Sequence, residues 1–265
     1  MPNSDFALVT GASSGIGEEL ARLFAKAGIP VVLVSRQKEK LDLIAGELRR
    51  QYGIEAHVFA CDLSDPASAQ RVFDFCQMTG LQVRYLVNNA GFGDYGPFSD
   101  SDPDKQQRMI GVNIGSLTLL TRLFLPSLLS AGRGRILQVA SMAAFLPGPG
   151  MAVYYATKAY VLHFSEAVSA EISGSGVTVT TLCPGPTYSG FYDAAGMQGI
   201  RLFELRKVPT ARKVAEFGYS AMMRGKRVAV YDRSNALTAS LIGFFPRGWV
   251  LRTSQYLNGK YGSAR

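Results

Sequence analysis

Two tyrosines and a lysine in the second half of the chain have the spacing for proton exchange with a bound oxygen atom. Lys158 lies four residues after Tyr154 and three after Tyr155, so a helix would place either phenol on the lysine's face. A phenol with an ordinary pKa of about 10 is a poor base at neutral pH, but a neighbouring ammonium favours the phenolate. The pair suits general acid–base chemistry, and helix geometry alone leaves both tyrosines open.

Two polar residues upstream could assist this chemistry. Ser141 lies 13 residues before Tyr154 and directly follows an apolar run, where its hydroxyl could hydrogen-bond a reacting oxygen. Asn113 interrupts an apolar helical pattern and needs partners if buried; a structural helix kink is the alternative interpretation. With only two histidines and three cysteines in the chain, the sequence argues against a zinc site, and no metal is expected.

Short apolar runs alternate with helical patterns about seven times along the chain. The runs are rich in β-branched residues, as buried parallel strands are, and cover Ala7–Thr10, Pro30–Ser35, Ala56–Ala60, Tyr85–Asn88, Arg135–Ala140, Thr178–Cys183 and Arg227–Tyr231. Helical patterns between them include Gly15–Ala27, Gln37–Tyr52, Pro66–Thr79, Lys105–Ser130 and Val153–Ser173. The alternation predicts a single doubly wound α/β domain of Rossmann type, with a parallel sheet of about seven strands and helices on both faces.

A glycine-rich turn joins the first predicted strand to the first predicted helix. Glycines permit a tight turn and close approach to a pyrophosphate, and the helix N-terminus presents free N–H groups. Arg36 follows the second strand, where an acidic residue would favour NAD and an arginine can neutralise the 2′-phosphate of NADP. A structural turn and a solvated arginine are the alternatives to NADP(H) binding. The expected contacts of the turn are Gly11, Ser13, Ser14, Gly15, Ile16 and Gly17.

The sequence resembles the classical short-chain dehydrogenase/reductase family. The motifs follow the family's order over about 175 residues: Thr10-Gly11-x-x-x-Gly15-x-Gly17, Cys61-Asp62-Leu63, Asn88-Asn89-Ala90-Gly91, Asn113, Ser141, Tyr154-x-x-x-Lys158 and Pro184-Gly185. The resemblance implies that Tyr154, rather than Tyr155, is the catalytic acid and that Lys158 also binds the nicotinamide ribose. It also implies that Asn113 holds a water molecule in a proton relay. It further implies cofactor contacts at Tyr154, Lys158, Asp62, Leu63, Asn89, Ala90, Gly91, Pro184, Gly185 and Thr187.

The family resemblance also implies a substrate pocket after Ser141 and a lid at about residues 186–212, and both stretches are rich in apolar residues. An apolar pocket favours a lipophilic carbonyl or alcohol. We therefore expect an NADP(H)-dependent oxidoreductase that interconverts a carbonyl and an alcohol, in the direction of reduction. A non-catalytic NADP-binding sensor or scaffold with the same fold is the alternative. The expected pocket residues are Met142, Phe145, Tyr188, Phe191 and Tyr192.

The formal net charge of +8 is concentrated near the C-terminal end of the chain. Residues 1–199 carry 15 basic and 17 acidic residues, whereas residues 200–265 carry 13 basic and only three acidic ones. No nucleic-acid-reading motif accompanies this charge, so a nucleic-acid partner is not expected. We expect residues 1–232 to form the catalytic domain and 233–265 a basic, apolar helical extension, broken at Pro246.

The extension has two alternative roles. Its apolar residues could pack on the core with arginines reaching outward, or they could meet a membrane surface or another subunit. The apolar run is too short and interrupted to span a bilayer. The first strand starts so early that a targeting peptide has no room, which favours a cytoplasmic protein, with membrane association through the extension as a variant. The resemblance implies a homodimer or homotetramer through helices Lys105–Ser130 and Val153–Ser173.

Overall fold

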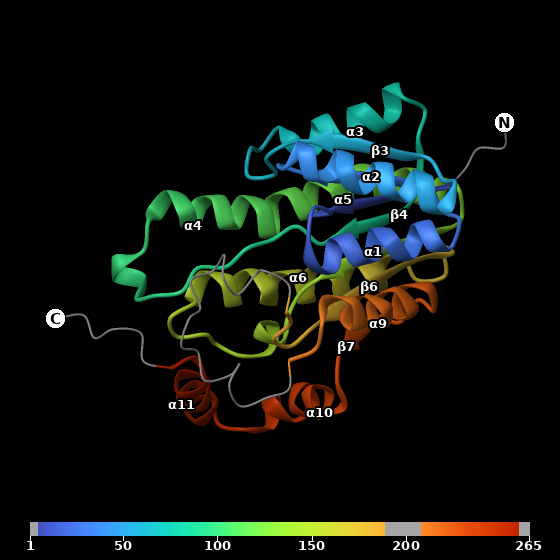
Figure 1. Ribbon diagram of the computed structural model, residues 1–265. Helices are drawn as coiled ribbons and strands as arrows, with labels where there is room; N and C mark the ends of the chain where they lie inside the picture. The colour runs from blue at the N-terminus through green and yellow to red at the C-terminus, as the bar shows by residue number, and fades with distance from the viewer. Residues whose placement is uncertain (1–4, 189–207, 260–265) are drawn as a thin grey trace.

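The computed structural model describes residues 5–188 and 208–259, and its centre is a parallel sheet (Figure 1). Within these residues seven strands lie in the order β3-β2-β1-β4-β5-β6-β7, which confirms the predicted doubly wound sheet. The strands are β1 (Asp5–Thr10), β2 (Val31–Ser35), β3 (Ala56–Ala60), β4 (Gln82–Asn88), β5 (Gly134–Val139), β6 (Val177–Cys183) and β7 (Val228–Val230).

The central strands are largely buried because helices cover both faces of the sheet. Every residue of β2 is buried, as a parallel strand between two helical layers requires. The strand order reverses at β1, where Val9 is in register with Leu33 of β2 on one side and Val87 of β4 on the other. Connections from β1 and β4 leave in opposite directions at this point, which opens a crevice at the carboxyl ends of the strands.

Two helical layers enclose the sheet (Figure 1). One apolar cluster joins the sheet to α1 (Gly15–Lys26), α2 (Lys38–Tyr52) and α9 (Ala211–Met223). A second cluster, on the opposite face, joins it to α3 (Ser68–Met78), α5 (Leu117–Ser130) and α6 (Ala152–Glu171). The helix that follows each strand therefore brings its first turn to the same edge of the sheet, where the crevice lies.

The long helix predicted at Lys105–Ser130 consists of three segments. Helix α4 (Pro103–Ile110) continues into a π-helical segment, η2 (Gly111–Ser116), and then into α5. Among the described residues one helix, this one, has the length and composition of a membrane span, with a mean hydropathy of 1.4. Core helices pass the same test, and Leu120, Phe124 and Leu128 pack in the cluster under the sheet. Core packing therefore accounts for part of its apolar character, since 39% of the apolar window is buried.

The chain after β7 forms the C-terminal extension. Asp232 caps α10 (Arg233–Leu241) by accepting a 2.8 Å hydrogen bond from the Ser234 N–H. A short 3₁₀ turn, η4 (Ile242–Phe244), leads to α11 (Arg247–Asn258), which starts after Pro246 as predicted. Two large apolar residues of the extension do not pack on the core: Phe244 is 85% exposed to solvent and Trp249 is 65% exposed. The predicted boundary at residue 232 stays a prediction.

Candidate active site

The glycine turn after β1 is fixed by hydrogen bonds from the end of β4. The Thr10 hydroxyl accepts from the backbone N–H groups of Asn89 (2.9 Å) and Ala90 (3.0 Å), and donates to the Val87 carbonyl (3.2 Å). The Asn89 side-chain amide donates in turn to the carbonyls of Thr10 (2.9 Å) and Gly11 (3.3 Å). These contacts hold together the two strand ends that border the crevice.

Close packing explains two of the glycines in this turn. Gly11 has a φ of +66°, and a Cβ there would lie 2.8 Å from the Asn89 amide nitrogen. A Cβ on Gly17 would collide with the Gly11 carbonyl oxygen and the same amide. The turn therefore brings bare backbone to the cavity at the first turn of α1. The turn thus has the shape of a cradle that would fit a pyrophosphate, and Asn89 supports it from behind.

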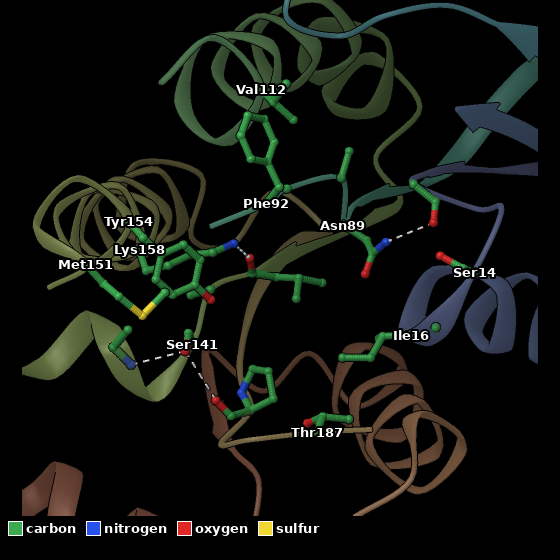
Figure 2. A pocket seen from close by; sticks show the side chains of 18 of the residues that line it. Ser14, Ile16, Asn89, Phe92, Val112, Ser141, Met151, Tyr154, Lys158 and Thr187 are labelled. Atoms are coloured by element: carbon green, nitrogen blue, oxygen red, sulfur yellow. Dashed lines mark hydrogen bonds between the residues drawn. The ribbon is translucent and has the colours of Figure 1, made fainter. Parts of the chain in front are cut away.

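The tyrosine and lysine face the cavity from α6 (Figure 2). Lys158 Nζ donates a 2.8 Å hydrogen bond to the Val139 carbonyl at the end of β5 and lies 5.8 Å from the centre of the Tyr154 ring. Burial lowers the pKa of Lys158 to about 8. Burial also raises the pKa of Tyr154, against a smaller lowering by its hydrogen bond with the Ser141 side chain. The buried phenol therefore holds its proton at neutral pH.

Ser141 lies two residues after the end of β5 and caps a short 3₁₀ turn, η3 (Met142–Phe145). Its side-chain oxygen accepts a 3.1 Å hydrogen bond from the Ala143 N–H, and its hydroxyl lies 3.5 Å from the Pro184 carbonyl. The Met142 N–H also donates to that carbonyl, at 2.8 Å. The ends of β5 and β6 are thus joined, and Ser141 is oriented toward Tyr154 (Figure 2).

Tyr155 has a different environment from Tyr154. Its hydroxyl donates a 3.0 Å hydrogen bond to the side-chain oxygen of Asn258, in α11. A Cβ on Gly148 would collide with the Tyr155 ring, so the loop before α6 runs directly across it. Both contacts fix Tyr155 between this loop and the C-terminal extension.

Asn113 is 1% exposed and occupies the π-helical segment η2. Its amide nitrogen donates to the Phe92 carbonyl and the Thr157 hydroxyl, both at 3.0 Å, and its oxygen accepts from the Phe92 N–H at 3.1 Å. A Cβ on Gly91 would lie 3.0 Å from that oxygen and 3.4 Å from Lys158 Nζ. Gly91 therefore leaves a position open between an acceptor and a donor, which suits a bridging water.

One cavity of about 670 Å³ connects these groups. It runs from the glycine turn, with Ser14 and Ile16, past Asn89 to Lys158 and Tyr154 (Figure 2). All of the predicted cofactor contacts except Gly17 line this cavity, and Gly17 lies behind the residues that form its wall. The predicted residues that line the cavity are Gly11, Ser13, Ser14, Gly15, Ile16, Arg36, Asp62, Leu63, Asn89, Ala90, Gly91, Tyr154, Lys158, Pro184, Gly185 and Thr187.

The charged end of the cavity holds Arg36, Lys40 and Asp62. Partial burial raises the pKa of Asp62, but hydrogen bonds from Ser64 and the charges of Arg36 and Arg108 outweigh it, so the pKa is lowered. No group of three or more His, Cys, Asp or Glu side chains is placed to hold a metal ion in the part of the chain that the structure describes. The glycine cradle and the basic end together fit NADP(H).

The predicted substrate residues are less well placed. Met142 lines the cavity, but Phe145 packs instead in a neighbouring apolar cluster around Val161 and Leu162. Tyr188 is 68% exposed and bridges to Thr210, outside the cavity wall. Phe191 and Tyr192, with most of the predicted lid, lie outside the described residues.

Sequence reasoning missed the wall that the extension provides. Ser254, Leu257 and Asn258 of α11 line the cavity, as do Leu146 and Met151 from the segment between η3 and α6. Ser254 and Asn258 are buried and point inward, with Leu257 beside them on the same helical face. Their i, i+3, i+4 spacing could have identified this helical face from the sequence. Because two of the three residues are polar, however, nothing in the sequence indicated that the face is buried.

Residues 5–197 match the family described as short chain dehydrogenase. The chain belongs to this family. Short chain dehydrogenases are oxidoreductases, and strands β1 to β6, the glycine turn and the Tyr154–Lys158 pair lie within the matched region.

Similar proteins include two very-long-chain 3-oxoacyl-CoA reductases. The one from Anas platyrhynchos is 38% identical over 68% of this chain and 58% of its own length; the one from Homo sapiens is 32% identical over 93% and 77%. The aligned region thus spans less than two thirds of the Anas protein. A solved short-chain dehydrogenase from Sphingobium yanoikuyae in complex with NADPH has a TM-score of 0.80 and 31% identity, covering 91% of this chain and 94% of that one.

Proposed function

We propose that this short chain dehydrogenase reduces a lipophilic ketone or aldehyde with NADPH, and that Tyr154 is the general acid. The observation that carries the proposal is the single cavity that has Tyr154, Lys158 and Ser141 at one end and the glycine cradle at the other. A non-catalytic NADP-binding sensor would need the cradle alone. Nothing in its role would require a lysine and a serine placed around a buried phenol.

The chain's own residues can orient the cofactor. When bound, NADPH supplies the hydride. The N–H groups of the glycine turn would bind the pyrophosphate, and Arg36 with Ser13 would neutralise the 2′-phosphate. Asp62 and Leu63 would meet the adenine, while Pro184, Gly185 and Thr187 would contact the nicotinamide side. The NADPH bound in the solved Sphingobium yanoikuyae dehydrogenase supports this choice of cofactor.

Proton transfer follows from the environment of Tyr154. Burial raises the pKa of its phenol, so the hydroxyl is protonated and can donate to the substrate oxygen. The Ser141 hydroxyl would hydrogen-bond the same oxygen as its charge develops. The ammonium of Lys158 would stabilise the phenolate left behind. A water beside Gly91, between Asn113 Oδ1 and Lys158 Nζ, would return a proton toward the site.

The substrate end of the cavity favours an apolar molecule. Met142, Leu146, Met151 and Leu257 line it, and the relatives named as very-long-chain 3-oxoacyl-CoA reductases act, by their names, on long acyl chains. We therefore propose that the substrate is a lipophilic carbonyl compound, and 3-oxoacyl thioesters are among the candidates.

NADPH oxidation with a panel of long-chain 3-oxoacyl thioesters, steroid ketones and aryl ketones tests the proposal. We expect turnover with at least one lipophilic carbonyl, and a loss of about 10²- to 10⁴-fold in kcat for Tyr154→Phe. The matched variant Tyr155→Phe should keep most of its kcat, since its hydroxyl is bonded to Asn258. Tight NADPH binding without turnover across the panel would instead support the sensor, and retained turnover in Tyr154→Phe would refute the assigned acid.

We also propose that the protein is a homodimer or homotetramer assembled through α4, α5 and α6. The outer sides of these helices expose Ile110, Leu119, Leu129 and Tyr160. Apolar side chains on adjacent helices favour a subunit contact. Light scattering after size exclusion should give a mass of two or four chains, and a monomer at micromolar concentration would contradict it. The cytoplasmic location stays a prediction.

A further inference from the structure

We propose that the outer face of α10, η4 and α11 binds to an anionic lipid surface. This outer face comprises the exposed side chains of Arg233, Leu237, Leu241, Phe244, Phe245, Arg247, Trp249, Leu251 and Arg252. The helices that carry it lie along one margin of the molecule, on the far side of β7 from the sheet centre (Figure 1). Nothing in the proposed chemistry uses these side chains.

The apolar part of the outer face is unusually exposed. Phe244, Phe245 and Trp249 are 85%, 52% and 65% exposed, and every residue from Gly243 to Trp249 is exposed. Large aromatic side chains in water cost free energy, and a cluster of them on a soluble surface marks an interaction site. Tryptophan and phenylalanine are also the residues that insert at the boundary between lipid headgroups and acyl chains.

Helix α11 is attached to the body through polar side chains and leaves a large aromatic side chain exposed. Its buried residues are Ser254 and Asn258, whereas Trp249, on the opposite side of the helix, is 65% exposed. The Ser254 hydroxyl donates to the Pro147 carbonyl at 2.6 Å, and the Asn258 amide donates to the Pro149 carbonyl at 3.0 Å. The helix is thus held to the body by hydrogen bonds, and Trp249 on its opposite side is left for another environment.

The positive charge of the outer face indicates that its partner is anionic. Arg233, Arg247 and Arg252 are exposed, and none has an ion pair within the described residues. No acidic residue follows Asp232 in the sequence. A surface of anionic lipid headgroups would complement these arginines, each by about 1 kcal/mol. A second copy of the same face would instead bring like charges together, which disfavours a symmetric dimer here.

The length of the helices fixes the mode of contact. Helix α11 has 12 residues and is therefore about 18 Å long, well short of the roughly 30 Å of a bilayer core. It can lie in the interface but not cross it. Thr238 of α10 and Leu257 of α11 line the cavity from its inner side, so binding would bring the cavity close to the lipid. This last step rests on the proposed function; the surface itself does not.

Trp249 is the chain's single tryptophan, so its fluorescence reports on the outer face alone. We expect its emission to shift to shorter wavelength with vesicles of phosphatidylcholine mixed with phosphatidylglycerol, and to stay unchanged with phosphatidylcholine alone. Co-sedimentation of the full chain should follow the same order and weaken with salt. The assay needs no cofactor or substrate, so its result is independent of whether the proposed function holds.

Matched variants separate this surface from general stickiness. Phe244→Ser with Phe245→Ser should lower the vesicle partition coefficient by about tenfold or more, whereas Leu43→Ser with Met78→Ser, also highly exposed, should not. Arg247→Gln with Arg252→Gln should lower it by about tenfold, and Lys26→Gln with Arg50→Gln much less. Circular dichroism checks that each variant is folded.

Three results would overturn the proposal. They are absence of binding to anionic vesicles by the wild type, equal binding by the outer-face and control variants, and a dimer that dissociates in Phe244→Ser with Phe245→Ser without any vesicle binding. The last result would identify a second copy of the chain as the partner.

Discussion

The glycine turn and the C-terminal extension line the same cavity but are held in different ways. The turn combines side-chain hydrogen bonds of Thr10 and Asn89 with close backbone packing of Gly17 against Gly11. The extension is fixed by side chains: Tyr155 donates to Asn258 at 3.0 Å, and the Tyr95 hydroxyl donates to the Asn258 carbonyl at 2.7 Å. Backbone packing tolerates almost no substitution, whereas side-chain contacts can be lost one at a time.

This difference fits the two tasks. A dinucleotide presents the same pyrophosphate to every enzyme that uses it, so a rigid cradle suits it. A substrate wall made by a helix attached through a few hydrogen bonds can shift or change without disturbing the sheet. We therefore expect substitutions at the turn to affect folding and cofactor together, and substitutions at the extension to affect substrate contacts with the cofactor site intact.

Gly17→Ala is expected to have the largest effect. Its Cβ would collide with the Gly11 carbonyl, which cannot move away while Asn89 holds the turn. The free energy of unfolding should fall by about 3 kcal/mol, and the Kd for NADPH should rise. In the control Gly46→Ala, in α2, the Cβ meets nothing within 4 Å, so a gain of about 0.5–1 kcal/mol is expected. Equal stability of the two variants in urea unfolding would contradict the packing argument.

Arg36→Gln should raise the Kd for NADPH by roughly tenfold to a hundredfold, because a hydrogen bond to a charged group contributes about 1.5–3 kcal/mol. The Kd for NADH should barely change, since that cofactor has no 2′-phosphate. Titration of both cofactors, with Arg50→Gln as the control for lost charge, measures the effect. An equal loss for NADPH and NADH would show that Arg36 does not contact the phosphate.

Asn258→Ala should loosen the extension and leave the turn unchanged. It leaves the Tyr155 hydroxyl and the Pro149 carbonyl without their partner, at a cost of about 1–2 kcal/mol. Hydrogen exchange should accelerate in α11, and KM for the carbonyl should rise more than kcat falls. Gln255→Ala, exposed on the same helix, is the control. Unchanged exchange in α11, or a matching loss of NADPH affinity, would break the proposed independence of the two regions.

The smallest effect near neutral pH is expected from the titration of Lys158, which lies between the two regions. Burial lowers its pKa to about 8, so the ammonium is present below that pH and is lost as pH rises through it. The value of kcat/KM for NADPH, which reports on the free enzyme, should therefore decline above pH 8. Lys158→Arg keeps its charge, so whatever activity remains should not show that decline. A flat wild-type profile beyond pH 9 would contradict the assignment.

Local sequence determined the nucleotide side of the fold well. Val31–Ser35 and Val177–Cys183 are rich in β-branched residues, which predicts buried parallel strands, and Gly11, Gly15 and Gly17 stand where a strand meets a helix. The helical spacing of Tyr154 and Lys158 likewise needs no knowledge of distant residues. Each of these signals lies within a few positions of the chain, so periodicity and turn chemistry were enough to detect it.

The substrate side depended on contacts that no local pattern encodes. Phe145 was expected in the pocket, but the η3 turn directs it into the cluster around Leu162. Asn113 was expected inside an apolar helix, with a helix kink as the alternative interpretation, and it lies in a π-helical segment, a rare form that hydropathy does not distinguish from an α-helix. Asn258 contacts residues 103, 109 and 163 positions earlier, and its burial follows from those distant partners.

The same long separation sets an order of assembly during synthesis. A ribosome delivers the chain from its N-terminus, and β1, the glycine turn, β4 and Asn89 are all complete within the first 89 residues. The Tyr155 hydroxyl has no partner until Asn258 emerges, 103 residues later. The nascent protein can therefore form its nucleotide cradle well before its substrate chamber closes. A chain released before α11 would lack the part of the cavity wall that Ser254, Leu257 and Asn258 provide.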